Sequence, residues 1–522
     1  MQIKIERRVL YNGSFKRILY SLCFCMFCII DQRVRTAYGP AGWLETFRDL
    51  TGVVMAVVIM SHYKLDDFKR WKLPYIVWGI ISIGIGIPAF VWGMYNQRCL
   101  KDWFVILLDI ALFGVIVIHT FISVVLEKKA PKLNRRFAAL WFIMMLLMIL
   151  SRSNYIWPFC YLVMFGCFYL TDYTAEEQED LFQGILNGII LGFFLIQGFA
   201  FIFRPYDEVR YVGAYLNTNN NALFYLEVFA AVVAKIIYIT KRNSSKWIRL
   251  FYWLGAGTVL SFIFLTIGRT AWITAFILGL VFLWAFKKSF GKSILKNGLV
   301  LVLCMCLTFP FCFGAARYLP PVFHHPVWFE SEWNENKVHS WDAWDSEKYV
   351  SLDKFLESAV GRIAKTVREL LKHSPFLLHV SAAEAEREYM LTVEEGRDGI
   401  MMRSAIYKYY ASRLNLWGHP KEGQGFQVTE RYWAWHAHNI LLQYGTDFGI
   451  VVMILFIIVS IWSFILLRKK FLVNRNEQYI GYLFFAMIPI LYGMFECSWG
   501  TGALSILMMF LAWKEAFQAD RD

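Results

Sequence analysis

The stretch Trp435-His436-Ala437-His438-Asn439-Ile440-Leu441-Leu442 lies where a long polar segment ends and an apolar run to about Leu467 begins. The length of that run predicts a membrane helix. Asn439 has the side chain of a helix N-cap, and His438 carries an imidazole that can accept or donate a proton near neutral pH. The stretch therefore predicts a proton-handling group at the mouth of a membrane helix. The alternative is that both side chains only cap the helix at the membrane interface.

The composition is that of a membrane protein. Of the 522 residues, 58% are hydrophobic and 18% aromatic, and many of them form long apolar runs. The formal net charge of +13 comes from basic clusters between those runs, which is typical of helix-flanking charges and not of a nucleic-acid-binding surface. The ten cysteines lie mostly inside apolar stretches, so we expect neither a disulfide framework nor a thiolate zinc site. The expected surroundings are a lipid bilayer, with no nucleic acid as partner.

The apolar runs predict an all-α polytopic protein with about fourteen transmembrane helices. The expected helices lie near residues 16–31, 43–62, 73–95, 103–126, 137–151, 156–171, 181–203, 221–240, 250–267, 270–286, 298–319, 440–467, 479–497 and 501–513. They divide the chain into an N-terminal transmembrane bundle at 1–319, a loop domain at 320–439, and C-terminal transmembrane helices with a tail at 440–522. The loop has helical periodicity at 352–371 and at 400–413, which favours a small folded domain over a linker.

The orientation follows from the basic clusters on alternate connections. Lysines and arginines gather near 4–17, 64–72, 128–136, 241–249, 287–296 and 468–475. By the positive-inside rule these connections and both termini are cytoplasmic. The acidic connection at 172–180 is assigned to the same side by its parity. The loops at 204–220, 268–270 and 320–439 then share the outer face.

Three arginines on that outer face are candidate anion ligands. Arg210 opens a stretch that continues through Asn217 and Asn219 into a helix, Arg269 lies at a tight turn between two apolar runs, and Arg403 begins a helical pattern in the long loop. The guanidinium fork matches phosphate oxygens, and the asparagines can bind hydroxyls or cap the helix. The alternative for Arg210 is an interfacial arginine whose charged head reaches water. For Arg269 it is an arginine that packs between helices, and for Arg403 an arginine on a solvated helix face. Glu227, on the helix after the asparagines, is the membrane carboxylate expected to reach the same site.

The order of these motifs resembles the O-antigen ligase and O-antigen polymerase family over roughly residues 180 to 497. The matching elements are Arg-x-x-Gly followed by Asn-x-Asn, the turn Gly-Arg-Thr-Ala-Trp, the loop element Arg…Asn-Leu-Trp-Gly-His, and His-x-His-Asn at the start of a helix. The resemblance implies a metal-independent glycosyltransferase that uses polyprenyl-pyrophosphate-linked saccharides. By motif, Arg210 and Arg403 are similar to the family's pyrophosphate-binding arginines, His438 to its loop histidine and Arg269 to its turn arginine. Met402 stands where the family has glycine before the loop arginine, so Gly396-Arg397 is a rival match.

The sequence thus leads us to expect a polymerase of lipid-linked oligosaccharide repeats in a bacterial cytoplasmic membrane, with its site facing outside. Its expected catalytic residues are His438, Arg210 and Arg403; the expected substrate-binding residues are Arg269, Asn217, Asn219, Asn439, His436, Arg397 and Glu227. We expect no metal, no cofactor and no nucleotide site. The expected partners are the lipid-linked donor and a flippase and chain-length regulator of the same pathway. The alternatives are a ligase that moves the finished glycan to another acceptor, and a flippase or exporter that makes no bond.

Overall fold

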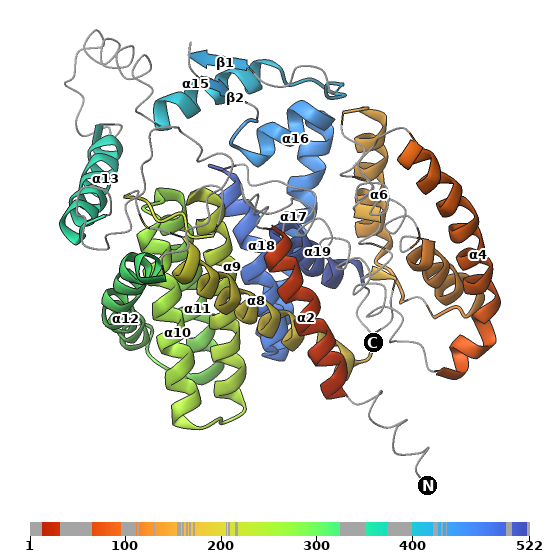
Figure 1. Cartoon of the computed structure of the whole chain (residues 1–522), viewed down its shortest axis with the longest axis horizontal. Helices are drawn as coiled ribbons and strands as arrows, with labels where there is room; N and C mark the ends of the chain where they lie inside the picture. Colours follow the sequence, from red (N-terminus) through yellow and green to blue (C-terminus); the bar gives the residue numbers. More distant parts are fainter. Residues whose placement is uncertain are drawn as a thin grey trace.

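The computed structural model describes residues 13–31, 65–95, 114–129, 131–153, 173–204, 209–214, 218–323, 350–372, 399–420, 426–429, 432–434, 436–496 and 504–518, with single positions between 111 and 206. Within these residues the fold is helical (Figure 1). The helices are α2 Gly13–Asp31, α4 Leu65–Tyr95, the short π-helix η1 Ile122–Leu126, α6 Arg135–Leu150, α8 Ala175–Phe203, α9 Thr218–Lys241, α10 Lys246–Leu265, α11 Arg269–Phe290, α12 Ile294–Phe323, α13 Leu352–Lys372, α15 Gly399–Ser412, α16 Ile440–Phe448, α17 Ile450–Asn474, α18 Glu477–Gly493 and α19 Leu504–Phe517. A short antiparallel hairpin joins β1 Phe426–Thr429 to β2 Tyr432–Ala434.

Seven helices in the described part of the chain are long and apolar enough to cross a membrane. They are Lys69–Trp92 within α4, and α8, α9, α10, α11, α12 and α17. Large apolar side chains such as Phe276, Leu295 and Phe311 are more than half exposed on these helices, which is the outer surface of a protein in contact with lipid. The prediction of a helical membrane protein is therefore confirmed. The run predicted at 43–62 lies outside the described residues, as do most of 103–113 and 156–171.

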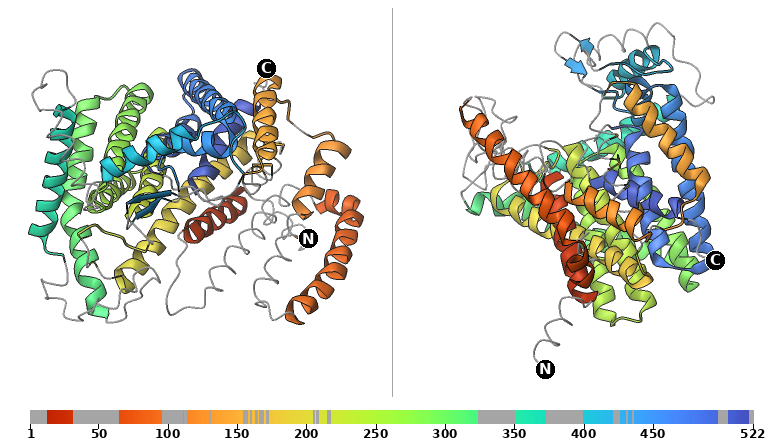
Figure 2. Two further views of the ribbon diagram at one scale, coloured as in Figure 1. Left: turned by 90° about the horizontal axis from the view of Figure 1, so that it is seen from above. Right: turned by 90° about the vertical axis from the view of Figure 1, so that its right-hand side faces the viewer.

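Helix α9 forms the centre of the bundle and lies among α8, α10, α11 and α18 (Figures 1 and 2). In the most apolar stretch of α9, 89% of the residues are buried, so its side chains contact protein on all sides. Helix α2 lies along α8, where Gly184, Gly188 and Gly192 leave no room for a side chain against Tyr20, Phe24 and Cys28. Small residues spaced by one turn are the usual means of bringing two membrane helices close together.

The run predicted as one helix at 440–467 is two helices, and this part of the prediction is wrong. α16 ends at Phe448 and α17 begins at Ile450, with Gly449 between them at φ +100°. A Cβ at Gly449 would collide with the carbonyl oxygen of Leu416, while Ile450 N donates to Asn415 O at 2.8 Å. The break arises because the segment that follows α15 packs against the junction.

Replacing Gly449 with alanine is expected to destabilise the fold by more than about 1 kcal/mol, because the residue has positive φ and touches a carbonyl. Gly198→Ala is the matched control. Gly198 lies inside α8, and a Cβ there meets nothing within 4 Å. Thermal unfolding in detergent compares the two variants. Equal midpoints for Gly449→Ala and the wild type would contradict the strained junction.

Opposite charges gather at one end of the bundle. Lys16 and Arg17 of α2 pair with Glu177 and Asp180 of α8, each at 2.6 Å. At the same end Arg242 pairs with Glu179, and Lys241 pairs with Glu477 at 2.8 Å. The acidic connection therefore lies beside two of the basic clusters, as the parity of the helices requires. We refer to this set of ion pairs as the charged end, and α9 runs from it to the opposite end at Thr218.

Candidate functional site

Arg210 ties the loop before α9 to the turn between α10 and α11. Its Nε donates to Thr266 O at 3.1 Å, and its Nη2 donates to Asn219 Oδ1 at 3.0 Å. Burial, followed by the nearby charges of Arg362 and Arg403, lowers the pKa of Arg210 to about 10, so the guanidinium is still protonated at neutral pH. The Asn219 side chain therefore holds the guanidinium at the start of α9, at the end of the helix opposite the charged end.

The loop that carries Arg210 is fixed by a buried hydrogen-bond network. Gln197 of α8 donates to the Tyr211 hydroxyl and accepts from the Tyr225 hydroxyl of α9, both at 2.7 Å. Arg204 Nε donates to Gly213 O at 2.8 Å, and Tyr211 N donates to Leu265 O at 3.0 Å. Because each of these partners is buried, the loop has a defined position against three helices.

Arg403 and His438 meet on one carboxylate, Glu496, which follows α18 and is 5% exposed. Arg403 of α15 donates from Nη2 to Glu496 Oε1, and His438 Nδ1 lies 3.4 Å from Glu496 Oε2. Tyr407, one turn after Arg403, donates to His438 O at 3.0 Å and lies 3.3 Å from Met494 O. One carboxylate therefore joins α15 to the histidine stretch before α16.

Asn439 caps α16, as the sequence predicted. Its Oδ1 accepts from Leu441 N at 2.9 Å and from Leu442 N at 3.0 Å. Its Nδ2 donates to Met494 O at 2.9 Å, next to the segment that carries Glu496. The cap therefore joins the histidine stretch to the end of α18.

His436 lies beside His438, with their ring centroids 4.2 Å apart. On a helix, residues two positions apart would face different directions. Both residues precede α16 in non-helical backbone, and His438 has φ +47°. Burial, and then the neighbouring His438, lowers the pKa of His436 to about 4, so its imidazole is neutral at physiological pH.

Tyr492 connects the two halves of the cluster. It lies one turn before Glu496, and its hydroxyl donates to Asn219 O at 2.8 Å, on the residue that holds Arg210. The charges of Glu496 and Arg403 both act on the Arg210 guanidinium. The structure therefore brings Arg210, Arg403 and His438 together near Glu496. We name these four residues the polar cluster.

The other predicted residues differ in where they lie. Arg269 is the first residue of α11, at the turn whose Thr266 carbonyl accepts from Arg210. Glu227 is fully buried in α9, about 12 Å along the helix axis from Asn219. Asn217 and Arg397 lie outside the described residues.

The sequence interpretation did not assign Glu496 to the site. The available signal was an ionisable residue at the end of an apolar run, because such a residue is costly without a partner. Tyr407 and Tyr492 carried no comparable signal, since a hydroxyl at the end of an aromatic ring is common at a membrane interface. Their contacts, Tyr407 with Met494 O and Tyr492 with Asn219 O, depend on how distant segments pack together.

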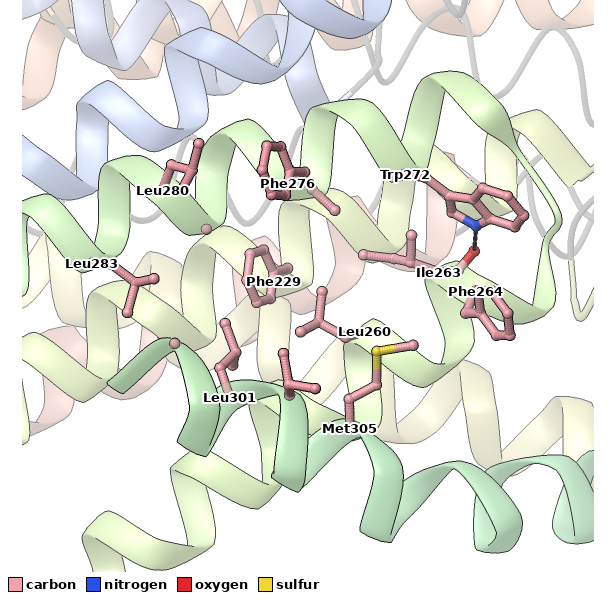
Figure 3. A pocket seen from close by; sticks show the side chains of 14 residues that line it. Phe229, Leu260, Ile263, Phe264, Trp272, Phe276, Leu280, Leu283, Leu301 and Met305 are labelled. Atoms are coloured by element: carbon pink, nitrogen blue, oxygen red, sulfur yellow. Dashed lines mark hydrogen bonds between the residues drawn. The ribbon is translucent and has the colours of Figure 1, made fainter. Parts of the chain in front are cut away.

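An apolar cavity of about 380 Å³ lies among α9, α10, α11 and α12 (Figure 3). Trp272 and Phe264 lie at one end, and Leu280 and Leu283 at the other. The ring of Trp272 stacks on Phe264, and its Nε1 donates to Ile263 O at 3.3 Å. The end with Trp272 is the one next to the turn whose Thr266 carbonyl accepts from Arg210.

The fold and the polar cluster together define a polytopic helical membrane protein with a cationic site at one end of its bundle. No family model, no curated protein and no solved structure matches this chain.

Proposed function

We propose that the protein is a membrane glycosyltransferase that polymerises polyprenyl-pyrophosphate-linked oligosaccharide repeats, as in the O-antigen ligase and polymerase family. The observation that carries the proposal is the meeting of Arg210, Arg403 and His438 around Glu496, from three separate parts of the chain. Two guanidiniums and an imidazole supply the two functions that such a transfer needs. These are anion stabilisation and proton acceptance.

In the proposed reaction an acceptor hydroxyl attacks C1 of the donor saccharide, and the C1–O bond to pyrophosphate breaks. The bonding electrons leave with the polyprenyl pyrophosphate, whose added negative charge Arg210 and Arg403 stabilise. The hydroxyl proton passes to the imidazole of His438, while Glu496 beside Nδ1 stabilises the imidazolium that forms. The activated donor provides the free energy, so no nucleotide takes part.

The apolar cavity beside the turn supports a lipid-linked donor. Its walls consist of aromatic and aliphatic side chains, which suit a hydrocarbon chain and not a saccharide. Basic clusters lie at the charged end, which is at the opposite end of α9 from Arg210. By the positive-inside rule the charged end is cytoplasmic. We therefore propose that the polar cluster faces the outside of a bacterial cytoplasmic membrane. The proposed protein has about fourteen membrane helices, and its 320–439 loop domain lies on the same outer face.

The test is to incubate purified protein in lipid with a lipid-linked repeat unit and to separate the products by size. A ladder of lengthening glycans is the expected result. Transfer only to a different acceptor would indicate the ligase alternative. Movement of intact donor across the bilayer without any new bond would indicate an exporter and contradict the proposal.

Activity is expected to survive excess EDTA, because arginine can meet the charge of pyrophosphate without a divalent cation. The measurement is turnover on a lipid-linked donor before and after chelation. Turnover within about twofold of the untreated protein is expected, since each step above uses only side chains. Complete loss that only a divalent metal restores would contradict the mechanism.

Glu496→Gln is expected to lower kcat about 10²-fold with little change in KM for the donor, because Glu496 positions Arg403 and His438. The matched control is Glu477→Gln. It removes a carboxylate of similar burial, paired with Lys241, from the other end of α18. Steady-state kinetics of both variants provide the comparison, and equal losses would show that Glu496 acts only through folding.

A further inference from the structure

The side chain of Gln443 reaches back from α16 to the histidine stretch that precedes this helix. Its Oε1 accepts from Ala437 N at 2.8 Å, and its Nε2 donates to Asp447 Oδ2 at 2.8 Å. Asp447 lies one turn later on α16 and is buried. Because a carboxylate accepts and an amide nitrogen donates, Asp447 fixes which end of the Gln443 amide faces Ala437.

Ala437 lies between the two histidines, in backbone that belongs to no helix or strand. Its side chain is fully buried and packs with Ile406 and Tyr410 of α15, which lies beside α16 (Figure 1). The N–H of a buried residue needs an acceptor, and Gln443 Oε1 supplies it. Ala437 is therefore held by α15 through its side chain and by α16 through its backbone.

The backbone turns sharply at His438, directly after Ala437. His438 has φ +47°, a left-handed conformation that a residue with a Cβ keeps only where its surroundings hold it. Tyr407 of α15 donates to the His438 carbonyl oxygen at 3.0 Å, and His438 Nδ1 lies 3.4 Å from Glu496 Oε2. The direction of the imidazole depends on this turn, so a shift of the Ala437 peptide would move the ring relative to Glu496.

We propose that Gln443 is a positioning residue of the site, which holds the histidine stretch so that His438 faces Glu496. Gln443 acts through the Ala437 N–H and not on the substrate, and Asp447 keeps its amide in the required direction. The expected effect on transfer rests on the proposed function. Misplacing a catalytic group by about 1 Å can lower a rate about 10²-fold, so a single hydrogen bond to the backbone can matter for turnover.

Hydrogen exchange of the Ala437 amide tests the contact without any substrate. The full chain in detergent is compared with Gln443→Leu, which keeps the approximate size of the side chain and removes the acceptor. The Ala437 N–H is expected to exchange about tenfold faster in this variant. The matched control is Thr446→Val on the same helix, which removes a buried hydroxyl that donates to Leu442 O at 2.8 Å. Its Ala437 N–H is expected to exchange as in the wild type.

Steady-state transfer on a lipid-linked repeat unit tests the effect on turnover. Gln443→Leu is expected to lower kcat about 10-fold to 10²-fold with little change in KM for the donor, whereas Thr446→Val keeps the wild-type kcat. Gln443→Glu combined with Asp447→Asn exchanges donor and acceptor in the bond between the two side chains and keeps an oxygen for Ala437 N. This double variant is expected to retain kcat within about fivefold of the wild type.

The decisive comparison adds Gln443→Leu to His438→Ala. If Gln443 acts through His438, the second change is expected to cost nothing further, because the group that it positions is already absent. A multiplicative loss would overturn the inference, as would unchanged exchange of the Ala437 N–H in Gln443→Leu. Wild-type kcat in Gln443→Leu would refute this inference alone. Faster Ala437 exchange in Gln443→Leu, together with a wild-type protein that transfers no glycan, would refute the proposed function alone.

Discussion

His438→Ala is expected to lower glycan transfer about 10²- to 10⁴-fold, the range for loss of a general base. The imidazole is the group in the polar cluster that is proposed to accept the hydroxyl proton, and Glu496 beside Nδ1 stabilises the imidazolium that forms. The measurement is polymer laddering in a deletion strain that carries the variant, together with turnover of the purified protein.

Protein level, membrane insertion and the thermal unfolding midpoint of His438→Ala should match those of the wild type. The side chain makes no cap, since Asn439 alone supplies the cap acceptor of α16. The comparison variant is His436→Ala, which removes a neutral ring beside His438 and is expected to cost less. A normal ladder from His438→Ala would remove this residue from the mechanism.

Arg210→Lys and Arg403→Lys are each expected to lower transfer about 10-fold to 10²-fold, although the charge is kept. A guanidinium binds phosphate through two parallel hydrogen bonds, whereas an ammonium offers a point charge. Arg210 also loses its two-sided contact with Thr266 O and Asn219 Oδ1, which a lysine cannot reproduce. Arg413→Lys is the control, because Arg413 is an exposed arginine just after α15 whose Nη1 contacts Tyr409.

The double variant of Arg210 and Arg403 tests whether both bind one ligand. If they share a pyrophosphate, the double variant should be little worse than the worse single, because the second loss removes contacts to a group already misplaced. Rates for the two singles and the double provide the measurement. Multiplicative losses would indicate two separate sites, and an inactive Arg397→Lys beside a normal Arg403→Lys would move the loop contact to Arg397.

The sequence was sufficient to predict a helical membrane protein, because apolar runs of membrane length have few other solutions. It also identified Asn439 as a cap, since capping depends on residues next to it in the chain. It missed the break at Gly449, where the cause is the Leu416 carbonyl from a distant segment. A glycine in an apolar run is common in membrane helices, so the pattern gave no reason to end the helix there.

The candidate site was predicted as separate residues and not as a constellation. Arg210 and His438 were found from their chemistry and their place at helix ends, but the pairing of Arg403 with Glu496 depends on how α15 lies against the segment that follows α18. The position of His436 depended on whether its stretch was helical, and the backbone there is irregular. Glu227 was expected near the site from its helix alone, yet its place is set by how deep α9 lies in the bundle.

The central claim is that the polar cluster breaks a sugar–pyrophosphate bond, and the most direct measurement counts products. Purified protein in lipid vesicles is supplied with a lipid-linked repeat unit, and released polyprenyl pyrophosphate is quantified beside the new glycosidic bonds. We predict one lipid pyrophosphate released for each bond formed, with both lost together in His438→Ala. Donor that crosses the bilayer intact, with no pyrophosphate released, would contradict the account.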